Sequence, residues 1–206
     1  MTAPAPLHFL ALGDSYTIGE ALPAAARWPA VLVARLRLAG MVIDDPHIVA
    51  VTGWTTDELA HGMDEAMLAP PYDLVTLQIG VNNQYRGRTA EDYRREFGGL
   101  LARAITLAGS RPARVVVVSI PDWGVTRFAR EQDRDPVAIA AALDLFNASA
   151  RQQAGRAGSQ FVDITSLSRH APHEVASDGL HPSAAQYARW VEAIEPVTLA
   201  VLQPTF

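Results

Sequence analysis

The sequence contains neither cysteine nor lysine. Without cysteine, the chain forms no disulfide and has no thiolate nucleophile or cysteine metal site, and its redox compartment stays open. All 17 basic residues are arginine. A phosphate-binding loop with Gly-Lys-Ser/Thr, a lysine Schiff base and a Ser–Lys dyad are therefore excluded.

Excess positive charge and long apolar runs are also missing. The formal net charge is −5 and no basic cluster is present, which argues against nucleic-acid binding. No apolar stretch approaches the length of a membrane span, and residues 1–12 lack the basic start and long apolar core of a signal peptide. We therefore expect a cytoplasmic protein without stable membrane insertion.

Length and composition favour one globular domain over residues 1–206. Hydrophobic residues make up 49% of the 206 and charged residues 19%, a balance typical of a folded chain. The sequence does not indicate an oligomeric state.

Apolar segments of strand length alternate with helical patterns along the whole chain. The four consecutive valines from Val115 to Val118 are typical of a strand covered on both faces. This alternation predicts an α/β fold, a doubly wound three-layer domain around a five-stranded parallel sheet. The expected strands are residues 7–12, 46–51, 74–79, 114–120 and 161–164. The expected helices cover residues 29–39, 89–108 and 136–153, with two more starting at Thr55 and Pro182 and a long loop over 165–181.

Polar residues and glycines follow the expected strands. Ser15 comes after the first strand, Gly53 after the second and Asn82 after the third, while Asp178 and His181 lie beyond the fifth. Open parallel sheets bind ligands beyond the carboxyl ends of their strands. We therefore expect these five residues to converge on one rim of the sheet.

Four short blocks in this order resemble those of the SGNH/GDSL hydrolases, a family of esterases and lipases. They are Gly13-Asp14-Ser15, Gly53, Gly80-Val81-Asn82 and Asp178-Gly179-Leu180-His181. The resemblance implies the flavodoxin-like SGNH-hydrolase fold and hydrolysis of a small-molecule ester.

The same resemblance implies the site residues. Ser15 would be the nucleophile of a triad with His181 and Asp178. The oxyanion hole would be formed by the backbone N–H groups of Ser15 and Gly53 and by the side-chain amide of Asn82. The family's third block usually ends in Asp, and here Asn83 replaces it, so a carboxylate that would support the Asn82 loop is missing.

The chemistry explains why these residue types are needed. A serine hydroxyl is a weak nucleophile until a base removes its proton, and an unperturbed imidazole titrates near pH ~6.5. Asp178 would hold His181 in the required tautomer. Gly179 allows the tight turn between them, and Pro182 favours an extended conformation at His181 before a new helix.

Other residues have plainer interpretations. Asp14 suits a loop carboxylate that accepts hydrogen bonds from nearby N–H groups. Trp123 and Phe128 either line an acyl pocket or pack as a cover over the loop. Tyr187 and Trp190 are expected to face the core.

The remaining charged and metal-binding candidates are also given plain interpretations. Arg86 and Arg88 are expected to be solvated. His170 and His173 do not form a plausible metal pair because Pro172 separates them. We expect no cofactor and no metal, and activity that survives chelators.

Three alternatives remain open at this stage. The same triad would serve an acyltransferase or a thioesterase. A flavin mononucleotide-binding electron carrier is a second alternative, because Ser15-Tyr16-Thr17 is a hydroxyl-rich first loop, although Asp14 would repel phosphate. The third is a binding module that has lost catalysis. Within the esterase hypothesis little chain is left for a lid, so we expect an open cleft and short acyl chains, acetyl to butyryl.

Overall fold

A computed structural model describes residues 5–203. It contains a five-stranded sheet in the order β2-β1-β3-β4-β5, and all neighbouring strands are parallel. The order reverses direction between β1 and β3, which makes the carboxyl end of these two strands the topological switch point. The strands are β1 (Phe9–Gly13), β2 (His47–Ala50), β3 (Leu74–Gln78), β4 (Val115–Val118) and β5 (Gln160–Val162).

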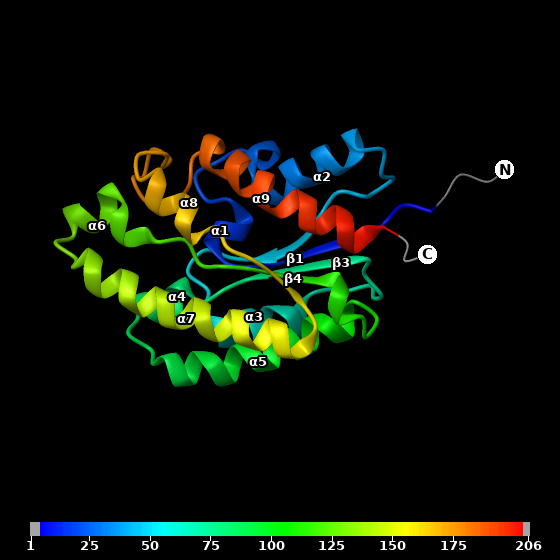
Figure 1. The fold of residues 1–206 in the computed structure, drawn as a ribbon, viewed down its shortest axis with the longest axis horizontal. Helices are drawn as coiled ribbons and strands as arrows, with labels where there is room; N and C mark the ends of the chain where they lie inside the picture. Colours follow the sequence, from blue (N-terminus) through cyan, green and yellow to red (C-terminus); the bar gives the residue numbers. More distant parts are fainter. Residues whose placement is uncertain (1–4, 204–206) are drawn as a thin grey trace.

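Helices cover both faces of the sheet and complete the predicted three layers. Figure 1 shows α2, α8 and α9 on one face and α3, α5 and α7 on the other. The α-helices are α1 (Ser15–Ile18), α2 (Trp28–Leu38), α3 (Thr56–Glu65), α4 (Val81–Tyr85), α5 (Ala90–Leu107), α6 (Arg127–Glu131), α7 (Pro136–Ala157), α8 (Thr165–His170) and α9 (Ala184–Leu202). Short 3-10 turns lie at η1 (Ala24–Ala26), η2 (Pro112–Arg114) and η3 (Trp123–Val125).

The central strands are fully buried, which for β4 is what the valine run predicted. Every residue of β1, β3 and β4 is buried. On one face they pack against α9, whose Tyr187 and Trp190 are completely buried, as expected. A parallel sheet sandwiched in this way leaves only its strand ends open for a ligand.

Helix starts follow the local signals that the sequence contains. Thr55 and Glu58 form the expected capping box at the start of α3. Asp135 caps α7, where its carboxylate accepts hydrogen bonds from the N–H groups of Val137 and Ala138.

Three expectations about helices near the end of the chain were wrong: the end of α7, the absence of α8 and the start of α9. Helix α7 continues to Ala157, beyond the expected end at residue 153, and stops at Gly158, which adopts a left-handed conformation. Residues 165–170, expected as loop, form helix α8. Helix α9 begins at Ala184, because Ser183 rather than Pro182 forms its cap by accepting a hydrogen bond from the N–H of Gln186.

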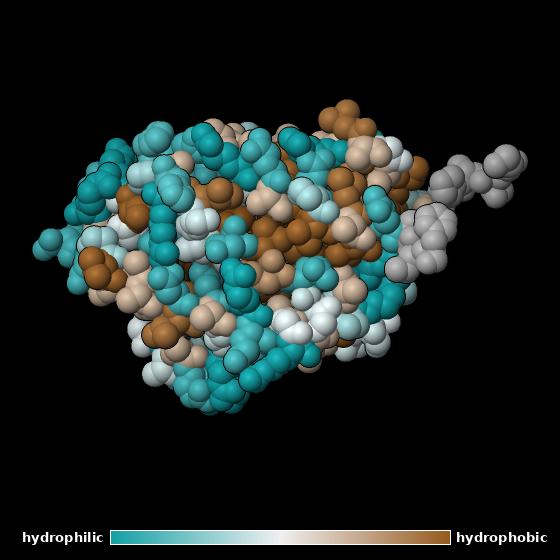
Figure 2. All heavy atoms as spheres, viewed as in Figure 1, coloured by the Kyte–Doolittle hydropathy of each residue, from teal (hydrophilic) through white to brown (hydrophobic). Residues whose placement is uncertain are grey.

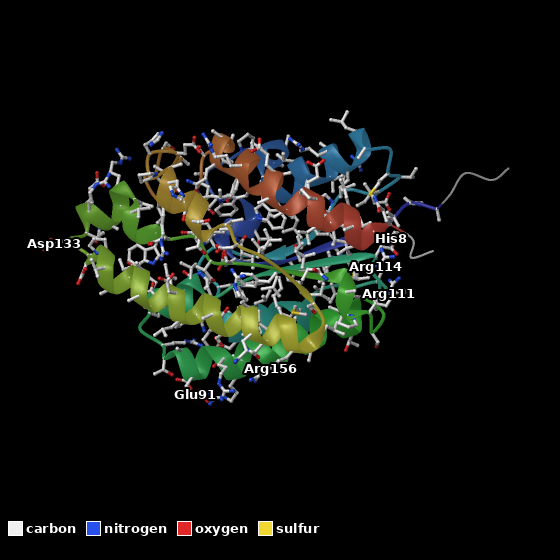
Figure 3. All side chains as sticks on the ribbon, in the orientation of Figure 1. His8, Glu91, Arg111, Arg114, Asp133 and Arg156 are labelled. Carbon is white, nitrogen blue, oxygen red and sulfur yellow. The ribbon has the colours of Figure 1, made fainter. Side chains whose placement is uncertain are left out.

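The surface has both polar and apolar regions. Figure 2 shows a hydrophilic surface along α5, and in Figure 3 labelled charged side chains such as Glu91 and Arg156 project outward. Within residues 5–203 no helix is both long and apolar enough to span a membrane. The carboxyl ends of the strands lie at the left of Figure 1, near α1, α4 and α6.

Candidate active site

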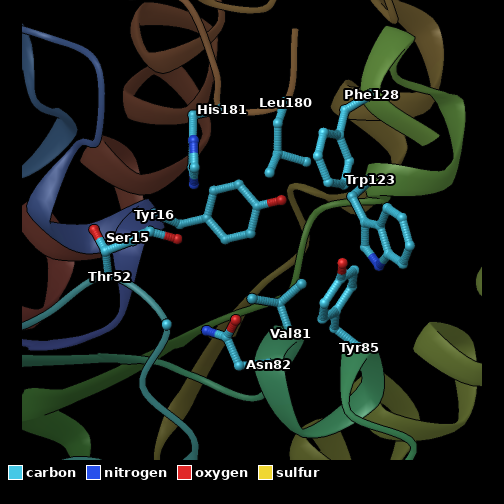
Figure 4. Close-up of a pocket in the computed structure, with 11 residues that line it drawn as sticks. Ser15, Tyr16, Thr52, Val81, Asn82, Tyr85, Trp123, Phe128, Leu180 and His181 are labelled. Atoms are coloured by element: carbon cyan, nitrogen blue, oxygen red, sulfur yellow. The ribbon is translucent and has the colours of Figure 1, made fainter. Parts of the chain in front are cut away.

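The loops that leave β1, β2 and β3 meet the segment before α9 in one cleft at the carboxyl end of the sheet (Figure 4). The cleft has a volume of about 210 Å³. Four of the five predicted site residues line it, and the fifth, Asp178, hydrogen-bonds to His181, one of these four. The lining residues are Ser15, Tyr16, Thr52, Gly53, Val81, Asn82, Tyr85, Trp123, Phe128, Leu180 and His181.

Ser15 is placed by a sharp turn from β1 into α1. A Cβ on Gly13 would lie 2.1 Å from Oγ1 of Thr17 and 2.6 Å from the carbonyl oxygen of Gln78, so only glycine allows this close approach. Ser15 is the first residue of α1, and therefore its N–H has no partner inside the helix. The turn leaves both the hydroxyl and the N–H of Ser15 at the cleft.

Asp14 caps α1 and is 1% exposed. Its carboxylate accepts a hydrogen bond from the N–H of Tyr16 at 3.0 Å, which confirms the interpretation as a loop carboxylate. Burial raises the pKa of Asp14 to about 7, although hydrogen bonds from the N–H groups of Tyr16 and Gly80 oppose the shift. Asp14 therefore connects the Ser15 loop to the start of α4.

Asp178 and His181 form a hydrogen-bonded pair beside the cleft. Nδ1 of His181 lies 2.7 Å from Oδ2 of Asp178, and Gly179 between them has φ +73°, as the expected turn requires. Partial burial acts to raise the pKa of Asp178. Hydrogen bonds from the ring of His181 and from the N–H groups of Leu180 and His181 outweigh that effect and hold this pKa below its usual value. The carboxylate is therefore ionised at neutral pH.

The imidazole of His181 points toward Ser15 (Figure 4). The ring of Tyr16 packs against it edge-on, with the ring centres 5.6 Å apart. The structure brings Ser15 and His181 into one cleft without a hydrogen bond between their side chains. Such bonds are often long in unliganded enzymes and shorten when a substrate binds.

The predicted oxyanion donors lie on the same cleft. Within residues 5–203 the N–H groups of Ser15 and Gly53 donate no hydrogen bond. Gly53 has φ +89°, a conformation that favours glycine. The amide nitrogen of Asn82 donates one hydrogen to the carbonyl of Trp54 at 2.9 Å, which leaves its second hydrogen for a ligand.

Asn83 supports the Asn82 loop despite the missing carboxylate. Its side chain is fully buried, and its Oδ1 accepts a hydrogen bond from the N–H of Thr56 at 3.1 Å. Its Nδ2 donates to Oγ1 of Thr56 at 2.6 Å and to Oε2 of Glu96 at 3.4 Å. Asn83 thus fixes α4 to the first turn of α3. The sequence suggested that the Asn82 loop had lost its support, but Asn83 provides it.

Apolar side chains form the wall of the cleft away from Ser15. Trp123 and Phe128 line the cleft, which agrees with the first of their two expected positions, the wall of a pocket. They stand on η3 and α6, and Nε1 of Trp123 donates to Oε1 of Gln84 at 2.8 Å. Tyr85 and Leu180 complete the wall. Sequence reasoning missed both, because an apolar residue beside a motif has no signature of its own.

Arg86 and Arg88 were expected to be solvated, but each forms an ion pair with an acidic side chain. Arg88 pairs with Asp57 at 2.6 Å. Arg86 donates to the carbonyl of Gly53 at 2.7 Å and pairs with Glu58 at 3.1 Å. Within residues 5–203 no group of three or more His, Asp or Glu side chains is arranged to hold a metal ion.

The comparisons with known proteins agree with this fold. TesA aligns with a TM-score of 0.74 and 18% identity over 95% of this chain and 99% of its own. EstA, a psychrotrophic esterase from Pseudoalteromonas sp., gives a TM-score of 0.73 and 14% identity over 95% and 98%. Axe2, an acetyl-xylooligosaccharide esterase from Geobacillus Stearmophilus, gives 0.67 and 20% over 97% and 95%. At these identities the likeness concerns the fold alone.

Sequence comparison defines the class of the protein. The model of the GDSL-like lipase/acylhydrolase family matches residues 11–189. None of the curated proteins compared with the chain matches it. The chain belongs to the GDSL-like lipase/acylhydrolase family and is a carboxylic ester hydrolase. This assignment replaces the flavin-binding alternative.

Proposed function

We propose that residues 1–206 act as one domain that hydrolyses small carboxylic esters through Ser15, His181 and Asp178. The main support is the 2.7 Å contact between His181 and Asp178 in a cleft that His181 shares with Ser15. Because Asp178 is ionised, it keeps the proton on Nδ1 of His181 and leaves Nε2 to act as the base.

The proposed reaction has two halves. Nε2 of His181 takes the proton of Ser15 while Oγ attacks the ester carbonyl, and a tetrahedral intermediate forms. His181 then gives this proton to the departing alcohol, and an acyl-enzyme remains on Ser15. A water molecule loses a proton to His181 and attacks the acyl carbon. The bond between that carbon and Oγ then breaks, His181 returns the proton to Oγ of Ser15, and the product leaves as the carboxylic acid.

Three donors would stabilise the negative charge on the carbonyl oxygen. They are the N–H groups of Ser15 and Gly53 and the free amide hydrogen of Asn82. Each belongs to a different strand-end loop, and Asn82 is hydrogen-bonded to the loop that carries Gly53. Donors held in place before the reaction stabilise the transition state without having to reorganise.

Short acyl groups, acetyl to butyryl, suit the size of the cleft. Its volume of about 210 Å³ is below the roughly 300–1,000 Å³ typical of drug-sized ligand sites. The rings of Trp123 and Tyr85 face each other edge-on at 5.4 Å and close one end of it. The similar fold of Axe2, whose name describes an acetyl ester substrate, is consistent with this size.

An ester panel tests the proposal. We expect the wild-type protein to hydrolyse p-nitrophenyl esters with the highest kcat/KM between acetyl and butyryl, and Ser15→Ala to be inactive. A fluorophosphonate should label Ser15 alone, as seen by intact mass and peptide mapping. Ser166→Ala, an exposed serine on α8, is the matched control and should be labelled like the wild type. Labelling at another residue would reject the assignment of Ser15, and a maximum at long acyl chains would reject the size preference.

A cytoplasmic location stays a prediction from the sequence, to be checked by cell fractionation.

A further inference from the structure

Asn82 of α4 and Arg86, the residue that caps the end of α4, hold two successive carbonyl groups of the loop after β2 with their side chains. Nδ2 of Asn82 donates to the carbonyl of Trp54 at 2.9 Å. Nη2 of Arg86 donates to the carbonyl of Gly53 at 2.7 Å. Asn82 and Arg86 are four residues apart, one in the first turn of α4 and the other at its C-cap, and this spacing puts both side chains on the same side. The backbone N–H of Arg86 also donates to the carbonyl of Asn82 at 3.0 Å, which ties the two positions together.

Arg86 is itself held by an acidic partner. Its Nη1 donates to Oε1 of Glu58 at 3.1 Å, and Oε2 of Glu58 accepts a hydrogen bond from the N–H of Thr55 at 2.8 Å. Glu58 is part of the capping box of α3, a fixed structural element. Arg86 therefore connects α4, the start of α3 and Gly53 through charge-assisted hydrogen bonds, which are stronger than neutral ones.

The loop that Arg86 holds needs an external support. Thr52 is exposed and Gly53 is only partly buried. Glycine has more backbone freedom than any other residue, so the direction of its N–H depends on contacts elsewhere. On the other side of Gly53, the hydroxyl of Thr52 donates to the carboxylate of Glu20. Arg86 makes the matching contact on the carbonyl side.

We propose that Arg86 is a positioning residue that holds Gly53 so that its N–H stays directed at the developing oxyanion. Arg86 does not line the cleft and touches no substrate, so it acts through Gly53. The proposal rests on the oxyanion role given to Gly53 under the proposed function. It adds an arginine outside the recognised blocks to the machinery of the site.

Removing the guanidinium while keeping an unbranched side chain tests the idea. Arg86→Met should lower kcat by about 10- to 100-fold and leave KM within about twofold, because only the transition state uses the oxyanion donor. The kcat of Arg86→Lys should lie between those of the wild type and Arg86→Met, because an ammonium group reaches either Gly53 or Glu58 and not both. Arg94→Met is the matched control, because Arg94 is exposed on α5 and, among residues 5–203, pairs only with Glu91, and it should keep the wild-type kcat.

Two further measurements separate positioning from a general structural role. A trifluoromethyl ketone, which forms an oxyanion-bearing adduct with a serine nucleophile, should bind Arg86→Met more weakly by the same factor by which kcat/KM falls. Arg86→Ala should regain activity when millimolar guanidinium is added, and not when ammonium is added. A loss of kcat without weaker ketone binding would overturn the proposal, whatever the effect on the melting temperature.

The control reactions distinguish failure of this inference from failure of the proposed function. If wild-type activity depends on Ser15 but Arg86→Met keeps a wild-type kcat, the role of Arg86 is rejected and the triad is unaffected. If the wild-type protein neither hydrolyses the ester panel nor is labelled at Ser15 by a fluorophosphonate, both proposals fall together.

Discussion

The unfolding free energy of Asp14→Asn, measured relative to that of the wild type, should increase as the pH rises. Asp14 is 1% exposed, and burial raises its pKa from the ordinary value of 3.8 to about 7. The folded protein therefore binds this proton more tightly than the unfolded chain does. The resulting stabilisation is fully present below pH 3.8 and is lost as the pH rises through about 7.

The size of the effect follows from the two pKa values of Asp14. They are about three pH units apart, and each unit corresponds to ~1.4 kcal/mol, so ionisation of Asp14 removes about 4 kcal/mol of folding free energy. Asparagine has almost the same shape, and its Oδ1 still accepts the hydrogen bond that Asp14 takes from Tyr16. Its amide does not titrate, so the variant avoids this loss.

The assay is urea unfolding of both proteins from pH 4 to pH 9 at constant ionic strength. The difference in unfolding free energy, Asp14→Asn minus wild type, should rise by about 4 kcal/mol over this range, mostly between pH 4 and pH 7, which are close to the pKa values of Asp14 in the unfolded and folded protein. Asp92→Asn is the control. The side chain of Asp92 is 43% exposed, and hydrogen bonds from Thr89 and Arg95 lower its pKa, so the difference for Asp92→Asn should not rise above pH 5. A difference for Asp14→Asn that is constant with pH would refute the reasoning.

Three further predictions concern the cleft and its support. Asn82→Ala should keep the fold and raise the activation free energy by ~2.7–4 kcal/mol, seen as a lower kcat, and a kcat near the wild-type value would reject Asn82 as an oxyanion donor. Asn83→Asp should cost about 1–3 kcal/mol at pH 8 in urea unfolding, because the new carboxylate faces Glu96. Adding Glu96→Gln should restore stability, and a single variant as stable as the wild type would contradict this. The kcat/KM should rise from pH 5 to pH 8, as catalysis by a general base of the histidine type requires, and a flat profile would be incompatible with a histidine base.

The sequence predicted those parts of the fold and site that depend on neighbouring residues. The valine run, the capping box at Thr55 and the αL turn at Gly179 are set by interactions within a few positions. The positions of Ser15 and His181 followed from topology, because parallel strands end at one edge of the sheet.

The parts that were not predicted depend on contacts between distant segments. Arg86 and Gly53 are 33 positions apart, and an isolated arginine near a loop gives no indication of which carbonyl it will hold. The sequence also gives no indication that Tyr85 and Leu180 form a wall of the cleft, because apolar residues that line a pocket follow no local sequence pattern. Helix α8 is only six residues long, and such a short segment carries too little periodicity to distinguish it from a loop.

Asn83 supports the site without carrying a charge of its own. A carboxylate only accepts hydrogen bonds, whereas an amide both accepts and donates. The oxygen of Asn83 accepts the hydrogen bond from the N–H of Thr56, so the new amide hydrogens need acceptors in a buried place. Glu96 supplies one from α5, where Arg88 lies 3.5 Å from its carboxylate and balances its charge. A negative charge thus lies near the first turn of α3, where a helix favours it, on the Glu96 side chain that Asn83 contacts.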